Sequence, residues 1–135
     1  MKLFLCWLTV FILTPLGLAS AAEHTKDSFD KVKQNLAQKQ AILLDVREPN
    51  EWDRGHLQDA QLLSLSELKR ASSDPAVKEK LAKDLPKDRI IYCHCQKGVR
   101  ALMAGTLLER LGYNVRPLEA GFDELRDAGF PTAKK

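Results

Sequence analysis

Cysteine is scarce in this chain, and its placement excludes two classes of protein. Of 135 residues only three are cysteine, Cys6, Cys93 and Cys95. A disulfide between Cys93 and Cys95 would close almost no loop and would be a poor structural staple. The sequence also lacks a second ligand cluster with zinc spacing, and three adjacent side chains in one strand cannot converge on one ion. We therefore expect no metal and no cofactor. We interpret the paired cysteines as residues that take part in a reaction.

The chain also lacks any block of charge of one sign. Its formal net charge is +3, and basic and acidic residues are mixed along its length. A mixed surface does not provide the basic footprint that nucleic-acid binding requires, so no nucleic-acid partner is expected. The length and the 44% of hydrophobic residues fit one ordinary domain with its own core.

One long uncharged run stands at the beginning of the chain. Residues 3–22 follow Lys2, carry no charged side chain and end in small residues. This arrangement is typical of a secretory signal peptide. An uncleaved anchor is the alternative, since the run approaches the roughly 20 residues of a spanning helix, although Pro15 and Gly17 interrupt it. We expect a cleaved signal peptide at 1–22, a domain at 23–135, and a periplasmic or secreted protein without stable membrane insertion after cleavage.

Apolar patterns in the remaining chain predict strands that alternate with helices. Continuous apolar runs predict buried strands. Helical spacing predicts helices, with Asp27 or Ser28, Ser64 or Ser66, and Asp74 as the capping residues. The segment 47–56, which contains Pro49 and Gly55, is expected to be a loop that can include one helical turn. The alternation is typical of an α/β fold, with a mostly parallel central sheet and helices on both faces. The strands are expected at 41–46, 60–63, 89–95 and 114–118, and the helices near 29–36, 67–71, 75–85, 100–112 and 122–129.

The turn after the third predicted strand carries the most informative residues. Ligands of parallel sheets bind at the carboxyl ends of the strands. A short turn there directs backbone amides into a concavity that binds an anion, and the next helix adds its positive end. Gly98 suits a position where a side chain would collide or φ must be positive. Lys97 and Arg100 add positive charge.

The same turn distinguishes the two cysteines. Cys95 stands at the mouth of the expected anion site, so we expect it to be a thiolate and the nucleophile. Cys93 lies two residues earlier in the strand and should point into the packing beneath, where it would be inert. A buried cysteine that merely fills space is the alternative for either residue.

Three segments, taken in order, resemble the single-domain rhodaneses, a family of sulfurtransferases. They are LLDVREPNEWDRGHLQDA at 43–60, CQKGVR at 95–100 and LEAGFDELRDAGFP at 118–131. The resemblance implies a rhodanese-like fold and a thiosulfate sulfurtransferase of the exported type, in which a cysteine holds a sulfane sulfur as a persulfide. It implies small sulfur-containing anions as donors and cyanide or a thiol as acceptor, and a protein acceptor stays open. It makes Cys95 catalytic and assigns binding of the sulfur to Gln96, Lys97, Gly98, Val99 and Arg100.

Nearby polar residues receive structural interpretations. His94 should face away from Cys95, because adjacent side chains in a strand point to opposite faces. Three charged residues, Asp45, Arg47 and Glu51, are candidates for an ion-paired brace under the loop. The resemblance implies that they hold the ends of the loop. A packed aromatic ring at Trp52 and a hydrogen-bonded imidazole at His56 are expected.

Three other functions remain as alternatives. A cysteine phosphatase or arsenate reductase would use a similar loop, but those enzymes place one more residue between cysteine and arginine than the four found here. A persulfide carrier or sulfur-sensing interaction module would share the same loop. A redox role through a disulfide between Cys93 and Cys95 would strain the strand.

Overall fold

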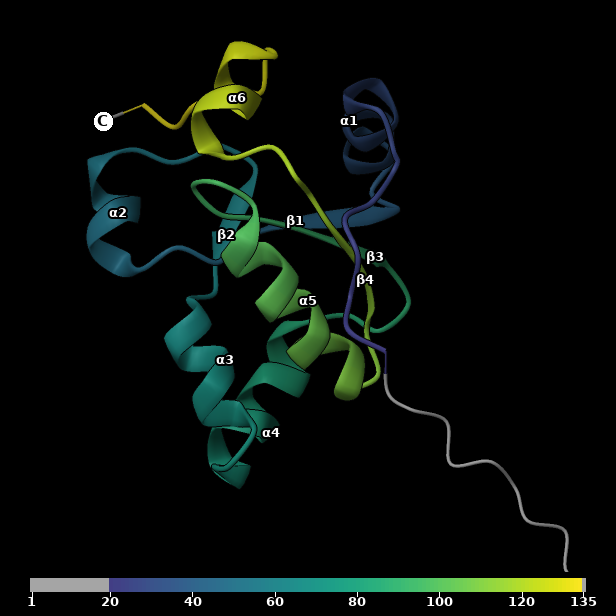
Figure 1. Ribbon diagram of the computed structural model, residues 1–135, viewed down its shortest axis with the longest axis vertical. Coiled ribbons are helices and arrows are strands. Elements are labelled where there is room, and N and C mark those ends of the chain that lie inside the picture. Colours follow the sequence, from purple (N-terminus) through teal and green to yellow (C-terminus); the bar gives the residue numbers. More distant parts are fainter. Residues whose placement is uncertain (1–19, 135) are drawn as a thin grey trace, which may run out of the picture.

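Four parallel strands form the centre of the protein, as a computed structural model of residues 20–134 shows (Figure 1). The predicted signal peptide at 1–22 falls almost entirely outside the described residues. The strand order is β2-β1-β3-β4, and each neighbouring pair is parallel. The four predicted strands are confirmed with small shifts at their ends, as β1 (Ala41–Asp45), β2 (Ala60–Leu62), β3 (Ile90–His94) and β4 (Asn114–Pro117).

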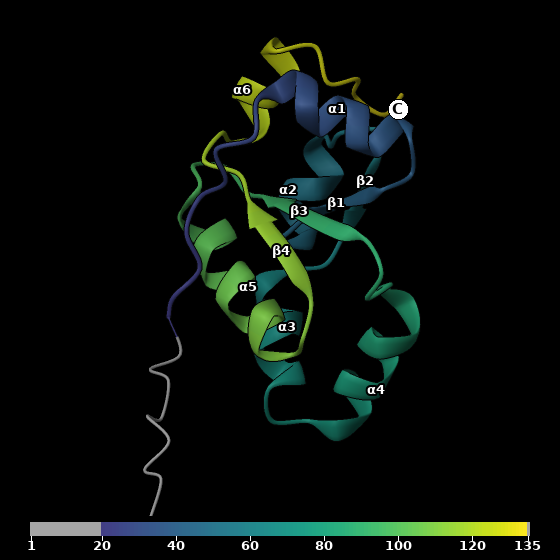
Figure 2. The same ribbon diagram turned by 90° about the vertical axis from the view of Figure 1, so that its right-hand side faces the viewer.

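Helices cover both faces of this sheet, which confirms the predicted fold class. In the two perpendicular views α3, α4 and α5 lie on one side of the sheet, and α1 and α6 lie on the other (Figures 1 and 2). Ser28, Ser64 and Asp74 accept backbone hydrogen bonds at the helix starts, so the first two are the caps among the predicted alternatives and the third is confirmed. The helices are α1 (Phe29–Ala37), α2 (Pro49–Arg54), α3 (Leu65–Ala71), α4 (Pro75–Asp84), α5 (Val99–Arg110) and α6 (Phe122–Asp127).

Helix α2 lies in a segment for which the sequence predicts a loop that can include one helical turn. Pro49 is the first helical residue, where its fixed φ and missing N–H are tolerated. The backbone N–H of Glu48 donates to the Glu51 carboxylate at 3.0 Å and closes the helix start. The helical part is therefore present but longer than the single turn predicted, with six residues, because Pro49 begins a helix here. This helix determines where Glu51 lies.

The two faces of the sheet receive alternate side chains of each strand. Leu44 of β1 is in register with Cys93 of β3, and both belong to the core under α3, α4 and α5. Asp45 is in register with His94, one position further along both strands. Leu43 and Tyr92, which are also in register, pack in the second core under α1 and α6. This alternation places the sulfur atom of Cys93 on the α5 side.

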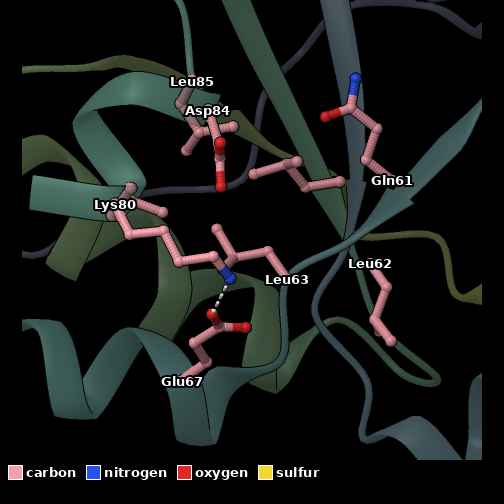
Figure 3. Close-up of a pocket in the computed structure, with 9 residues that line it drawn as sticks. Gln61, Leu62, Leu63, Glu67, Lys80, Asp84 and Leu85 are labelled. Carbon is pink, nitrogen blue, oxygen red and sulfur yellow. Dashed lines mark hydrogen bonds and ion pairs between the residues drawn. The ribbon is translucent and has the colours of Figure 1, made fainter. Parts of the chain in front are cut away.

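A hollow of about 350 Å³ lies at the β2 edge of the sheet, between the end of β2 and helices α3 and α4 (Figure 3). The Lys80 ammonium lies 3.4 Å from the Glu67 carboxylate across it, and both side chains are exposed enough for solvent to weaken this pair. The residues that line this hollow include no cysteine or histidine. Among residues 20–134 no helix has both the length and the apolar character that crossing a membrane requires.

Candidate active site

The turn between β3 and α5 lies where the order of the strands reverses. From β1 the chain adds β2 on one side and then crosses to add β3 on the other, so β1 and β3 flank the switch point. Ligands of open parallel sheets bind in the crevice at the carboxyl ends of such strands. In Figure 1 this turn lies between α2 and α6. The turn at residues 95–98 therefore lies close to three helices, α2, α5 and α6.

Cys95 lies in a concavity at this turn. Its side chain is 1% exposed, and its Sγ accepts a hydrogen bond from the Gly98 N–H at 3.0 Å. Gly98 is the residue that precedes α5, so the positive end of a 12-residue helix faces the same sulfur. Within the described part of the chain, this is the one hydrogen bond found to that sulfur. Cys95 lines a cavity of about 400 Å³ together with Glu51, Gln96, Lys97, Val99 and Arg100.

Gly98 is required at its position for two reasons, which the sequence predicts as alternatives. Its φ is 89°, a left-handed value that a residue with a Cβ seldom adopts. A Cβ at this position would also lie 2.6 Å from the Glu119 carbonyl oxygen, which is backbone and cannot swing away. The turn that aims the Gly98 N–H at Cys95 therefore depends on glycine.

Cys93 has the opposite environment. Its side chain is fully buried, and its Sγ donates to the Ala101 carbonyl oxygen at 3.4 Å. Burial raises the pKa of the Cys93 thiol well above its ordinary value, and the charge of Cys95 adds to this effect. The prediction that Cys93 points into the packing is confirmed, and its thiol is kept neutral.

Arg100 forms a two-fold ion pair with Glu51 at the wall of the cavity. The two guanidinium N–H groups donate to the two carboxylate oxygens at 2.6 and 2.7 Å. The Arg100 hydrogen bonds hold the pKa of Glu51 down to about 2, although burial opposes them. The sequence predicts Glu51 to lie in a brace with Asp45 and Arg47, whereas the structure pairs it with Arg100. Much of the positive charge of Arg100 is thus compensated.

Lys97 supplies the exposed positive charge beside Cys95. It lines the same cavity, and no ion pair of Lys97 is found among residues 20–134. Lys97 therefore provides positive charge at this cavity that no ion pair within residues 20–134 compensates.

The Glu51–Arg100 pair predicts an acid-sensitive contribution to stability. The pKa of Glu51 is lower in the folded state than its ordinary 4.5, so the contribution is fully present above about pH 4.5 and is lost toward pH 2. We expect Glu51→Gln to lower the free energy of unfolding by about 1 kcal/mol at pH 7, since both groups are partly exposed. The measurement is urea unfolding at several pH values. Equal losses in variant and wild type between pH 4.5 and 2 would contradict this assignment.

A second ion pair, formed by Asp45 and Arg47, is buried beneath the turn. The Arg47 guanidinium donates to Asp45 at 2.7 and 3.0 Å and to the Gly55 carbonyl oxygen at 2.8 Å. Its carbon lies 4.3 Å from the centre of the Phe122 ring. These contacts join the end of β1 to the loop after α2 and to α6, which agrees with the structural role predicted for both residues.

His94 faces away from the sulfur of Cys95, as predicted. Its Nε2 lies 3.7 Å from the Asp45 carboxylate and has no hydrogen-bond partner among the described residues. Its Nδ1 donates to the Cys95 carbonyl oxygen at 3.2 Å, because a carbonyl only accepts. Burial lowers the pKa of His94, and Asp45 opposes this only in part. His94 is thus a neutral ring that holds the peptide of Cys95.

Helix α6 fixes the other side of the turn. The Phe122 N–H donates to the Cys95 carbonyl oxygen at 2.9 Å, and the Gln96 amide donates to Asp123 at 2.8 Å. A Cβ at Gly121 would collide with the Gln96 carbonyl. Sequence reasoning missed these contacts, although a glycine directly before a predicted helix is the signal that could have indicated a close approach.

Trp52 and His56 support α2, in agreement with their predicted structural roles. Their rings are stacked, with centroids 3.6 Å apart and planes within 5°. The His56 Nδ1 also donates to the Trp52 carbonyl oxygen at 3.1 Å. These contacts stabilise the C-terminal end of α2, opposite to its capped N-terminal end.

Comparison with known proteins agrees with this geometry. A family model of the rhodanese-like domain matches residues 28–128. The uncharacterized protein YqhL of Bacillus subtilis is 33% identical over 85 residues, which are 62% of this chain and 60% of YqhL. The chain therefore spans less than two thirds of that curated relative.

Solved structures of single-domain sulfurtransferases are also similar. Human TSTD1 has a TM-score of 0.62 and 29% identity, over 73% of this chain and 91% of that one. RDL2 of Saccharomyces cerevisiae has a TM-score of 0.60 and 26% identity, over 78% of this chain and 94% of that one. These likenesses support sulfur transfer as the general activity. The chain belongs to the family of rhodanese-like domain proteins.

Proposed function

We propose that this protein moves a sulfane sulfur from thiosulfate to cyanide or a thiol through a persulfide on Cys95. The observation that carries the proposal is the contact between the Gly98 N–H and the Cys95 Sγ, at the start of α5 and inside a cavity. An amide and a helix end stabilise negative charge on sulfur, first as thiolate and then as persulfide. The four-residue spacing between Cys95 and Arg100 favours a bound sulfur atom over the larger phosphate group.

The reaction needs no external oxidant or reductant. The Cys95 thiolate attacks the outer sulfur of thiosulfate, a new S–S bond forms, and sulfite leaves with the electron pair of the broken S–S bond. Cyanide then attacks the outer sulfur of the persulfide, and thiocyanate leaves while the thiolate of Cys95 is restored. The loop residues from Gln96 to Arg100 surround the transferred sulfur in this scheme.

Steady-state formation of thiocyanate from thiosulfate and cyanide tests the proposal. Repeated turnover supports the enzyme, whereas uptake of one sulfur without turnover would support the persulfide carrier instead. Hydrolysis of p-nitrophenyl phosphate without thiocyanate formation would favour the phosphatase.

Lys97 should affect the anionic donor more than the acceptor step. We expect Lys97→Gln to raise the KM for thiosulfate about two- to fivefold at low salt, because one exposed charge near the cavity is lost. The kcat should change little, and the effect should shrink as salt is added. Lys78→Gln, at an exposed lysine of α4, is the matched control. Equal KM values for the two variants would contradict this role.

We also propose that the protein works outside the cytosol. The pattern of residues 1–22 supports this proposal. The mass of the protein recovered from the producing cells would test it, since cleavage should leave a chain that begins near Ala22 or Glu23. An intact leader on recovered, membrane-bound protein would favour the anchor.

A further inference from the structure

Residues 20–27 form an extended segment that runs beside α5 and β4 in both views (Figures 1 and 2), and we call it the N-terminal strap. The Ala22 N–H donates to the Thr106 hydroxyl at 3.0 Å, and the Thr25 N–H donates to the Pro117 carbonyl oxygen at 2.8 Å. Ala22 is buried against Gly105, where a Cβ would lie 3.2 Å from the Ala22 Cβ. The strap is thus fastened to both elements.

The C-terminal end of the strap is held by hydrogen bonds to the charged side chain of Asp27. Asp27 accepts hydrogen bonds from the Tyr92 hydroxyl at 2.6 Å and from Arg116 at 2.7 Å. These two donors hold the pKa of Asp27 below its ordinary value. The Tyr92 hydroxyl also accepts from Asn35 at 2.8 Å, which links the strap to α1.

Between these fastenings, the strap reaches the turn that carries Cys95. The His24 Nε2 lies 3.0 Å from the Gly98 carbonyl oxygen. A carbonyl only accepts, so the His24 Nε2 is the protonated donor in this contact. The helical hydrogen bond to the same oxygen, from the Leu102 N–H, is longer at 3.3 Å. His24 therefore provides the shorter of the two hydrogen bonds found to this carbonyl among residues 20–134.

The conformation of Gly98 determines where its N–H points. Glycine occupies positive φ about as readily as negative φ, so a glycine turn is not fixed by its own backbone. Here the carbonyl of Gly98 is held by His24, and its Cα lies against the Glu119 carbonyl. A held carbonyl restricts rotation about the bonds of Gly98, and the N–H of the same residue lies 3.0 Å from the Cys95 Sγ.

We propose that His24 is a positioning residue for sulfur transfer. Its hydrogen bond to the Gly98 carbonyl fixes the amide that stabilises negative charge on Cys95. This inference rests on the proposed function for its consequence in turnover, and it concerns a residue outside the region 28–128 that the family model matches. His24 remains in the chain after the proposed cleavage near residue 22.

The test compares three variants with the wild-type protein. His24→Phe keeps a ring of similar size but lacks the donor. His24→Gln restores an N–H near the position of Nε2. Ser28→Ala removes the N-cap of α1 at the end of the strap, and it controls for a loss of stability without a change at the turn. Thermal unfolding of each variant shows that it is folded at the assay temperature.

Two rates are measured for each variant. One is the rate of sulfur uptake from thiosulfate, and the other is labelling of Cys95 by iodoacetamide across a pH series, located by peptide mass. The charged neighbours of Cys95 in its cavity, Glu51, Lys97 and Arg100, are unchanged in all variants. We expect His24→Phe to slow sulfur uptake about three- to tenfold and to move the midpoint of labelling upward by about 0.5 to 1 pH unit.

The rates of the His24→Gln variant decide whether the N–H donor of His24 is responsible for the effect. His24→Gln should restore both rates to within about twofold, and Ser28→Ala should leave both unchanged. A Phe variant that equals wild type, or a Gln variant as slow as the Phe variant, would overturn the inference. An unchanged labelling midpoint in a slow Phe variant would overturn it as well. If the wild-type protein takes up no sulfur, the proposed function fails, and labelling alone decides whether His24 acts on Cys95.

Discussion

Replacing Cys95 with serine is expected to abolish thiocyanate formation to the level of the reaction without protein. A serine hydroxyl is not ionised at neutral pH and cannot hold a sulfane sulfur, so the covalent intermediate is lost. The fold should survive, because the Gly98 N–H that donates to the sulfur can donate to an oxygen instead. Far-UV circular dichroism and urea unfolding would check this point.

Cys93→Ser is the matched control for that result, because both cysteines are buried and belong to the same core. The Cys93 thiol donates to the Ala101 carbonyl, and a serine hydroxyl can use the same acceptor. We expect a loss of about 1 to 2 kcal/mol in stability from the more polar group and retention of most of the activity. The reverse ranking of the two variants would show that the wrong sulfur has been assigned.

Gly98→Ala is expected to have the largest effect among substitutions that leave every reacting group in place. An alanine at a φ of 89° costs about 1 kcal/mol, and the collision of its Cβ with the Glu119 carbonyl raises the total to about 2 to 4 kcal/mol. Relief of that collision must move the turn, so the Gly98 N–H should leave the Cys95 sulfur. Urea unfolding and the rate of thiocyanate formation measure the two losses.

Gly112→Ala separates the cost of a positive φ from the cost of the collision with the Glu119 carbonyl. Gly112 follows α5 and has a φ of 91°, nearly the same as Gly98, but a Cβ there would meet only the flexible end of Lys87 at 3.4 Å. Its cost should therefore be about 1 kcal/mol, without an effect on sulfur transfer. Equal losses of stability at Gly98 and Gly112 would show that the Glu119 carbonyl gives way and that the turn is not closely fitted.

Local features of the sequence were sufficient to predict most of the helices and strands of the fold. A buried parallel strand is a continuous apolar run, and Ser28 or Asp74 before a helix marks its start, so these elements can be located without tertiary information. Residues 95–100 were identifiable as a site because a strand, a short glycine turn and a helix follow one another directly. The segment 47–56 was harder, because its polar residues and Pro49 suit either a loop or a short capped helix.

The contacts that the sequence could not predict join residues far apart along the chain. Glu51 and Arg100 are 49 positions apart, and they meet only because α2 forms and lies at the switch point. His24 and Gly98 are 74 positions apart, and nothing in the local pattern around His24 indicates its partner. Such pairings depend on the packing of whole elements, which a single sequence does not specify by periodicity.

Intact mass after incubation with thiosulfate tests the central claim most directly, because it detects the intermediate itself rather than the product. The account predicts a gain of one sulfur atom per chain, which peptide mapping places on Cys95, which cyanide removes and which Cys95→Ser lacks. No gain in mass, or a stable gain located on Cys93, would contradict it.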